Sequence, residues 1–324
     1  NLTAANGTVL PKDGFIEEVT VDSTGNVKFS SDLPFGQYYV KEIATDDHYI
    51  INGTKYLVTF SYAGQDKNVV SLTVNNGTIE NKLKYGSVDG TKVDEYGEPV
   101  GEAVIGLYLT EDASEPVYTT VSDSNGKFRF DKVPFGTYYV REITQPEGFL
   151  LNTNVFPVTI VEDGDVIEVT IVNEYIKGSL TLTKIDEDYP ENKLTGAIFT
   201  IYRDSNNNGV YDNADKTVGT LTETTTGVYE SELLIYGRYF VKETKAPVGF
   251  IADSNAYEVF IDTHGKVYTI SNDTSGCFIN SPALGNLHII KTSEDGIVED
   301  FEFRVTGTTI TGQDYDETFV TDEN

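Results

Sequence analysis

The chain has 324 residues, which is more than one ordinary domain needs, so we expect two to four domains. Its 23 Lys and Arg residues are outnumbered by 52 Asp and Glu residues, and the net charge of -29 excludes nucleic acids and anionic membrane surfaces as partners because it repels them. Cys277 is the only cysteine, which excludes an intrachain disulfide and a multi-cysteine metal site, and no apolar run is long enough to span a membrane.

Short runs of alternating apolar and polar residues, separated by Gly, Asn and Asp, predict β-strands joined by tight turns. One phrase, aromatic-Gly-Xaa-Tyr-aromatic-Val-basic-Glu, occurs three times, 100 and then 101 residues apart, and starts at Phe35, Phe135 and Tyr236. A repeat of this length with only strand signals favours Greek-key sandwiches over a solenoid, whose repeats are usually about 20 to 50 residues long. The sequence therefore predicts an all-β chain of tandem immunoglobulin-like β-sandwiches.

Unit one, residues 1–83, contains the glutamate of this phrase, Glu42, and a later asparagine, Asn81, that ends the run Ile-Glu-Asn. It lacks an opening strand that carries a lysine. The chain also lacks methionine and opens on Asn1, so we expect it to be a piece of a longer protein from which the partner lysine of Glu42 and Asn81 was cut away.

Units two and three are complete, because each contains a lysine, then a glutamate, then an asparagine. Unit two, residues 84–175, has Lys92, Glu142 and Asn173. Unit three, residues 176–282, has Lys184, Glu243 and Asn280.

Unit four, residues 283–324, is the truncated start of a further domain. It keeps Lys291 but ends before any glutamate phrase, so we expect no crosslink of Lys291 within this chain. The step from the asparagine of one unit to the lysine of the next is 11 residues at all three boundaries. This constant spacing indicates that the lysine and the asparagine have related roles.

The glutamate and the asparagine of each complete unit, and Lys184 of unit three, each follow a large apolar residue by two positions. Side chains of a strand alternate between its faces, so each polar residue shares a face with its apolar neighbour and points into the interior. The same pattern places Lys291 on the inner face of its strand, whereas Arg141 and Lys242 point outward.

Burial lowers the pKa of a lysine and raises that of a glutamate, so a buried pair can be uncharged at neutral pH. A neutral glutamate would polarise the asparagine carboxamide, the lysine amine would attack its carbon, and ammonia would leave. The product is a Lys–Asn isopeptide bond. If the loop-entropy model for disulfides transfers, a crosslink around a loop of this size contributes about 4 to 5 kcal/mol.

An alternative is that Lys92 and Lys184 are strand-end residues whose amines reach water and pair with surface acids. This alternative explains neither the shared inward face nor the constant spacing.

Three segments of unit three resemble a known family, the Cna B-type or SpaA-like isopeptide-forming domains of Gram-positive surface adhesins and pilins. The segments are Lys184-Ile-Asp186, Gly196-Ala-Ile-Phe199 and the run from Glu243 through Ala246-Pro-Val-Gly-Phe250. The resemblance implies a transthyretin-like sandwich, a Lys–Asn bond promoted by glutamate, and a stalk or pilus backbone on the bacterial cell wall.

Unit three also contains an insertion rich in oxygen side chains, residues 204–215. The order of its residues reproduces much of an EF-hand calcium loop, with Gly209 at the sixth position, and similar loops occur in calcium-binding repeats of related adhesins. The alternative is a solvated turn in an acidic protein. The candidate calcium ligands are Asp204, Asn206, Asn208, Asp212 and Asp215.

The three histidines are scattered along the chain, so we expect no catalysis on an external substrate. The sequence predicts an extracellular structural segment that needs no cofactor except the calcium considered above. Its expected partners are the neighbouring domains, with host extracellular matrix or glycans reached through other parts of the protein. Two alternatives stay open, a module that itself binds a host ligand and a set of accessory domains from a secreted enzyme.

Overall fold

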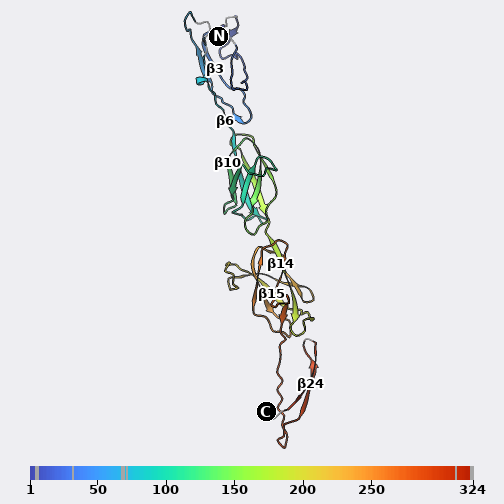
Figure 1. Cartoon of the computed structure of the whole chain (residues 1–324). Coiled ribbons are helices and arrows are strands. Elements are labelled where there is room, and N and C mark those ends of the chain that lie inside the picture. Colours follow the sequence, from blue (N-terminus) through green and yellow to red (C-terminus); the bar gives the residue numbers. More distant parts are fainter. Residues whose placement is uncertain (4–6, 31–32, 67–69, 71, 311, 322–324) are drawn as a thin grey trace.

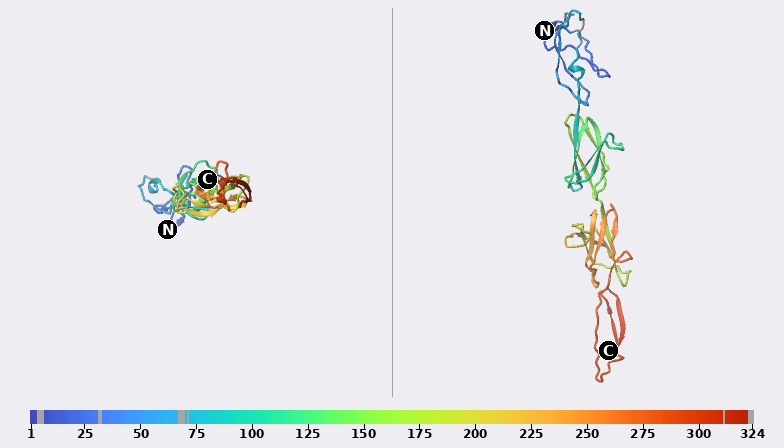
Figure 2. Two further views of the ribbon diagram at one scale, coloured as in Figure 1. Left: turned by 90° about the horizontal axis from the view of Figure 1, so that it is seen from below. Right: turned by 60° about the vertical axis from the view of Figure 1, so that its left-hand side comes forward.

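The chain is built from β-strands arranged as four bodies in a row, with the two termini near opposite ends (Figures 1 and 2). The one helical element of the described residues is the short 3-10 helix η1 (Asn75–Gly77), and no helix there is long and apolar enough to cross a membrane. The computed structural model describes residues 1–3, 7–30, 33–66, 70, 72–310 and 312–321.

Unit two is a sandwich of two sheets, in which the first strand, β7, lies beside the last strand, β13, in parallel. The first sheet consists of β10 (Lys127–Pro134), β7 (Tyr85–Asp94) and β13 (Val166–Asn173). The second sheet consists of β12 (Phe156–Ile160), β11 (Gly136–Thr144), β8 (Val104–Tyr108) and β9 (Tyr118–Val121).

Unit three repeats this plan, with β14 (Lys177–Asp186) as its first strand. Its closing strand is broken into two pieces, and both pair with β14 in parallel. The first sheet consists of β17 (Thr222–Thr225), β18 (Val228–Glu230), β14, β19 (Leu234–Ile235), β22 (Val267–Thr269) and β23 (Phe278–Asn280). The second sheet consists of β16 (Lys216–Thr220), β15 (Ile198–Arg203), β20 (Gly237–Lys245) and β21 (Ala256–Ile261).

Each of these two units has its own apolar core between its sheets. Ile105, Val140 and Ile171 are fully buried in unit two, and Phe199 and Phe278 are fully buried in unit three. Removing such side chains from water is the main favourable term in folding. The two tandem sandwiches that the sequence predicted are therefore separately packed.

Unit one is more open than units two and three, since none of its described residues is fully buried. Its strands form three antiparallel pairs. The pairs are β1 (Leu2–Thr3) with β2 (Val9–Leu10), β3 (Gly36–Val40) with β5 (Tyr56–Phe60), and β4 (Tyr49–Ile50) with β6 (Lys82–Leu83).

In unit four the strands are the hairpin β24 (Glu302–Thr308) and β25 (Asp314–Val320). The expectation that Lys291 lies on the inner face of a strand was wrong, because residues 283–291 form no strand and Leu287 is 69% exposed. The Lys291 amine lies over the Phe301 ring, 4.1 Å from its centre. Within the part of the chain that the structure describes, no strand pairs with residues 283–291, so alternation alone could not orient them.

The junction between units two and three is hydrogen-bonded on both sides of the linker. The Ile176 N–H donates to the Gly148 carbonyl, and the Ile176 carbonyl accepts from the Tyr236 N–H, both at 2.8 Å. The Tyr236 hydroxyl donates to Glu147, and the Tyr236 ring packs against Gly148, whose φ of +87° suits a residue without a side chain.

The junction between units one and two has the same bonds. The Lys84 N–H donates to the His48 carbonyl at 2.9 Å, and the Lys84 carbonyl accepts from the Phe135 N–H at 3.1 Å. The rings of His48 and Phe135 are in contact, with centres 4.7 Å apart. The aromatic residue that begins the repeated glutamate phrase therefore anchors each complete unit to the one before it.

Tyr236→Ala should loosen the junction between units two and three because it removes both the ring contact and the hydroxyl bond to Glu147. We expect faster cleavage of residues 174–177 in limited proteolysis and a broader distribution of lengths in small-angle scattering. Tyr189→Ala, at an exposed tyrosine outside this junction, is the control. Equal cleavage rates in the two variants would show that the contact adds no rigidity.

Candidate functional site

The three polar residues of unit two meet between its two sheets. Lys92 on β7 and Asn173 on β13 come from adjacent parallel strands of one sheet, and Glu142 comes from β11 of the facing sheet. Ile171 lies opposite Lys92, so Asn173 is two residues further along and on the same face. Lys92, Asn173 and Glu142 are 0%, 1% and 7% exposed.

The contacts between these groups are short. The Lys92 Nζ lies 3.9 Å from Glu142 Oε1 and 3.4 Å from the Ile171 carbonyl oxygen. The Asn173 Nδ2 donates to both oxygens of Glu142, at 2.9 and 3.0 Å. Among the described residues, no donor reaches the buried Asn173 Oδ1. Glu142 is therefore the group that contacts both the amine and the carboxamide.

Unit three repeats this geometry. The Lys184 Nζ lies 3.9 Å from Glu243 Oε1 and donates to the Phe278 carbonyl at 3.3 Å. The Asn280 Nδ2 donates to both Glu243 oxygens at 3.0 Å, and no donor in the described chain reaches Asn280 Oδ1. Two separately folded units thus present the same arrangement of atoms.

The electrostatics of the site follow from burial. Burial lowers the pKa of both Lys92 and Lys184 to about 8, although the neighbouring glutamates favour the charged amines. Burial also raises the pKa of Glu243, against its hydrogen bonds and the nearby Lys184. Near neutral pH each lysine is therefore uncharged far more often than an ordinary lysine, although the charged form still predominates. The uncharged form is the one in which an amine is nucleophilic.

Unit one retains two of the three groups. The Asn81 Nδ2 donates to Glu42 Oε1 at 2.8 Å, and no ion pair joins Glu42 to a lysine among the described residues. The fourth candidate lysine, Lys291, lies in unit four and has no such partners in the described part. The structure therefore assembles complete triads in units two and three and a lysine-free pair in unit one.

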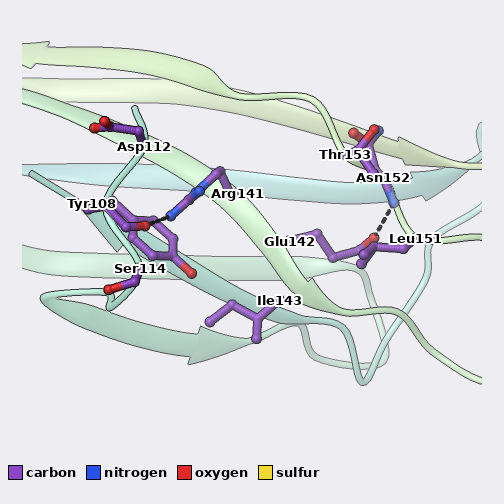
Figure 3. A pocket seen from close by; sticks show the side chains of 10 residues that line it. Tyr108, Asp112, Ser114, Arg141, Glu142, Ile143, Leu151, Asn152 and Thr153 are labelled. Atoms are coloured by element: carbon purple, nitrogen blue, oxygen red, sulfur yellow. Dashed lines mark hydrogen bonds between the residues drawn. The ribbon is translucent and has the colours of Figure 1, made fainter. Parts of the chain in front are cut away.

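Sequence reasoning missed a backbone donor that holds each glutamate. The N–H of the residue ten positions later donates to the second carboxylate oxygen, from Asn52 in unit one at 2.5 Å, Asn152 in unit two at 2.7 Å and Asp253 in unit three at 2.8 Å. Figure 3 shows this bond in unit two. The constant spacing of ten residues was the signal in the sequence that could have revealed it.

A glycine beside each lysine was missed as well. The Lys92 N–H donates to the Gly126 carbonyl at 2.6 Å, and the Lys184 N–H donates to the Gly227 carbonyl at 2.7 Å. A side chain on Gly126 would come within 2.2 Å of the Lys92 carbonyl oxygen, and its φ of +70° favours glycine. These turns fix the lysine backbone.

In the inserted loop of unit three the candidate calcium ligands form hydrogen bonds with one another and with the loop backbone. The Asp204 carboxylate accepts from the Asn208 and Gly209 N–H groups and lies 3.5 Å from Arg238 Nε. Asp212 Oδ2 accepts from the side chains of Asn206 and Asn208.

Asp215 completes the loop by accepting from the N–H groups of Ser205 and Asp212. Within the described residues, no three acidic, histidine or cysteine side chains gather in a way that could hold a metal. The oxygen donors are of the kind that calcium takes, so calcium binding by this loop stays a prediction.

A hollow of about 440 Å³ opens on the outer side of the unit two site (Figure 3). The Arg141 guanidinium lies on the face of the Tyr108 ring, 3.6 Å from its centre, and donates to the Ala113 carbonyl. Arg141 therefore points away from the interior, as strand alternation predicted, and takes no part in the triad.

Comparison with known families assigns the fold. A family model described as SpaA, a prealbumin-like fold domain, matches residues 1–78, 86–175 and 178–274. The chain belongs to this SpaA family. The expected fold class is thereby confirmed, because the matched segments include both packed sandwiches.

Individual relatives of the SpaA units are distant. Serine-aspartate repeat-containing protein F of Staphylococcus epidermidis is 24% identical over 372 aligned positions, which cover 95% of this chain and 20% of that protein. Colossin-A of Dictyostelium discoideum is 22% identical and covers 89% of this chain and 3% of that protein. The chain thus spans about a fifth or less of these relatives.

Among solved structures, the Bacillus anthracis TIE protein is similar to the SpaA chain with a TM-score of 0.66 and 25% identity. The match covers 86% of this chain and 49% of the TIE protein.

The two buried lysines should titrate far below surface lysines in a SpaA chain that keeps free amines. In the Asn173→Ala/Asn280→Ala variant we expect Lys92 and Lys184 to titrate near pH 8, against an ordinary value of 10.5. NMR of side-chain-labelled lysine would measure both. Two lysine signals that titrate with the rest would contradict the burial argument.

The lowered pKa values of Lys92 and Lys184 also determine how the stability of this variant changes with pH. A folded-state pKa below the unfolded value means that the folded variant binds fewer protons between these two values, so its stability should rise as pH increases from about 8 to about 10.5. Urea unfolding of the same variant at about pH 7 and about pH 10 would test the sign.

Calcium should bind the loop at 204–215 with a Kd on the order of 10⁻⁴ M, the range of extracellular modules. Calorimetric titration of the SpaA chain should show heat that Asp212→Ala removes. Asp112→Ala, in a loop of unit two, is the control. Absence of heat in the unaltered chain would identify the loop as a solvated turn.

Proposed function

We propose that this SpaA-family chain is a stalk or backbone segment of a cell-wall-anchored adhesin or pilin on the surface of a Gram-positive bacterium. Units two and three are each closed by a Lys–Asn isopeptide bond that the unit forms by itself. The observation that carries the proposal is the repeated triad, with 3.9 Å between lysine nitrogen and glutamate oxygen in both units.

The chemistry needs only the three side chains of each unit. In unit two, the uncharged Lys92 nitrogen forms a bond to Cγ of Asn173, and the bond between Cγ and Nδ2 breaks. Glu142 moves one lysine proton to the departing nitrogen, which leaves as ammonia. Atoms and charges balance, because an amine and an amide give a substituted amide and ammonia.

The unpaired Asn Oδ1 supports a neutral glutamate in this step. A buried carbonyl without a donor costs about 1 to 3 kcal/mol. A protonated glutamate carboxyl, which the raised pKa of Glu243 favours in unit three, can donate to this oxygen once the carboxamide turns over. This removes the cost and makes the carbon more electrophilic. The glutamate therefore serves as acid, base and positioning group for one reaction within its own unit.

The strand order explains how such a bond resists tension. Pulling on the chain loads β7 at its start and β13 at its end, and these neighbouring parallel strands would slide past each other. With Lys92 joined to Asn173, the force passes through β7 and the new bond, and residues 93–172 carry none of it. The same path runs through Lys184 and Asn280 in unit three.

This role implies neighbouring domains of the same chain as the direct partners, with boundaries at 83/84, 175/176 and 282/283. Contacts with host extracellular matrix or glycans belong to other parts of the protein. The only catalysis in the proposal is the single intramolecular reaction of each unit.

The intact mass of the denatured chain tests the proposal. We expect it to be two ammonias below the mass calculated from the sequence, since each bond releases one. Glu142→Ala should restore one ammonia, and the double variant with Glu243→Ala should restore both. Peptide mapping should locate Lys92 with Asn173 and Lys184 with Asn280 in crosslinked fragments.

Glu168→Ala is the control, because Glu168 is an exposed glutamate on β13 and its removal should leave both bonds intact. Glu142→Gln keeps the shape of the side chain and separates loss of the carboxyl from loss of folding. A wild-type mass equal to the calculated mass would refute the bonds and favour a module that binds a host ligand.

A further inference from the structure

One residue in unit two connects the glutamate with the closing strand. The Asn152 N–H donates to Glu142 Oε2 at 2.7 Å (Figure 3). The Asn152 Nδ2 donates to the Val172 carbonyl, also at 2.7 Å. Val172 directly precedes Asn173 on β13. Asn152 therefore fixes the backbone beside the reacting asparagine relative to the glutamate.

Unit one has the same connection. The Asn52 N–H donates to Glu42 Oε2, and its Nδ2 donates to the Glu80 carbonyl at 3.2 Å, directly before Asn81. The connection between the glutamate and the residue before the asparagine is therefore present in unit one, which has the Glu–Asn pair but no lysine beside it among the described residues.

Unit three has an aspartate at this position. The Asp253 N–H still donates to Glu243 Oε2 at 2.8 Å. An ionised carboxylate has no proton to donate, so it cannot bond the Ile279 carbonyl that corresponds to Val172. Hydrogen bonds from Tyr257 and from the Asn255 N–H hold the Asp253 carboxylate in place.

A second asparagine supplies the missing donor. The Asn272 Nδ2 donates to Asp253 Oδ2 at 3.0 Å and to the Ile279 carbonyl at 2.9 Å. The Asn272 Oδ1 accepts from the Ile279 N–H at 2.7 Å. Asp253 and Asn272 together thus make the connection that Asn152 makes alone.

Asn272 lies where the closing strand of unit three is broken. In unit two, β13 pairs with β7 over eight consecutive residues, but β23 pairs with β14 over only three. Residues 270–277 interrupt the strand, and Asn272 within them bonds both polar groups of Ile279. A strand this short has few ladder bonds of its own, so the position of Asn280 depends more on this connection.

We propose that Asn152 in unit two, and Asp253 with Asn272 in unit three, are positioning residues for isopeptide bond formation. Their side chains act through the backbone next to the reacting asparagine, and the N–H of Asn152 or Asp253 also holds the carboxylate of the glutamate. This inference rests on the proposed function. A displacement of about 1 Å costs such a reaction up to roughly 100-fold in rate, so loss of the connection should be measurable.

The test follows bond formation in each unit of the full chain after cell-free synthesis. Samples are quenched in denaturant, digested, and scored by mass for the peptide pair that has lost ammonia. In Asn272→Ala we expect bond formation in unit three to slow roughly tenfold or more, while unit two in the same molecule keeps its rate.

Rescue separates positioning from general stability. Asp253→Asn places a side-chain donor where unit two has one, so the double variant Asn272→Ala/Asp253→Asn should recover most of the rate in unit three. Conversely, Asn152→Asp should slow unit two alone, because no counterpart of Asn272 lies beside its uninterrupted β13.

Three results would overturn the inference. If Asn272→Ala leaves unit three at the wild-type rate, the connection is not needed. If Asn272→Ala slows unit three and Asp253→Asn fails to rescue it, the loss is one of stability. A wild-type chain that keeps both ammonias refutes the proposed function itself, whereas the first two results leave that function intact.

Discussion

The structure of each complete unit depends on burying a lysine, a glutamate and an asparagine in an apolar interior. Removing two ionisable groups from water costs several kcal/mol each, and mutual attraction often fails to recover it. The cost falls when the groups share hydrogen bonds and when the charges disappear. The Glu142 carboxylate accepts three hydrogen bonds, two from Asn173 and one from Asn152, and the pKa of Lys92 is lowered to about 8.

This requirement selects the topology. The lysine and the asparagine must lie on neighbouring strands and the glutamate on the opposite sheet, so the first and last strands of a unit pair in parallel. The chain then enters at one end of the sandwich and leaves at the other, and successive units follow one another in a row (Figure 2). The junction bonds at Ile176 and Lys84 continue this direction from one unit to the next.

The tandem sandwiches and most of the triad residues could be predicted from the sequence. The repeated phrases mark each unit, and the alternation of apolar and polar residues along a strand indicates which side chains are buried. Lys92 and Lys184 are fully buried, as the apolar neighbours of Lys184 and the constant spacing of the repeat predicted. The prediction for Lys291 failed because residues 283–291 form no strand, and alternation orients a side chain only where a partner strand exists. The roles of Asn152 and Asn272 were not readable from alternation, because they depend on which backbone groups the folded strands leave within reach of an amide.

The insertion at residues 204–215 lies between Lys184 and Asn280, in the part of unit three that the proposed bond would bypass. It projects from the body of the unit rather than from the strands that join one unit to the next (Figure 1). Mutations and further insertions there would leave the length and the strength of the row unchanged. A protein built in this way can vary the sequence and length of its loops while the strands that carry the load stay constant.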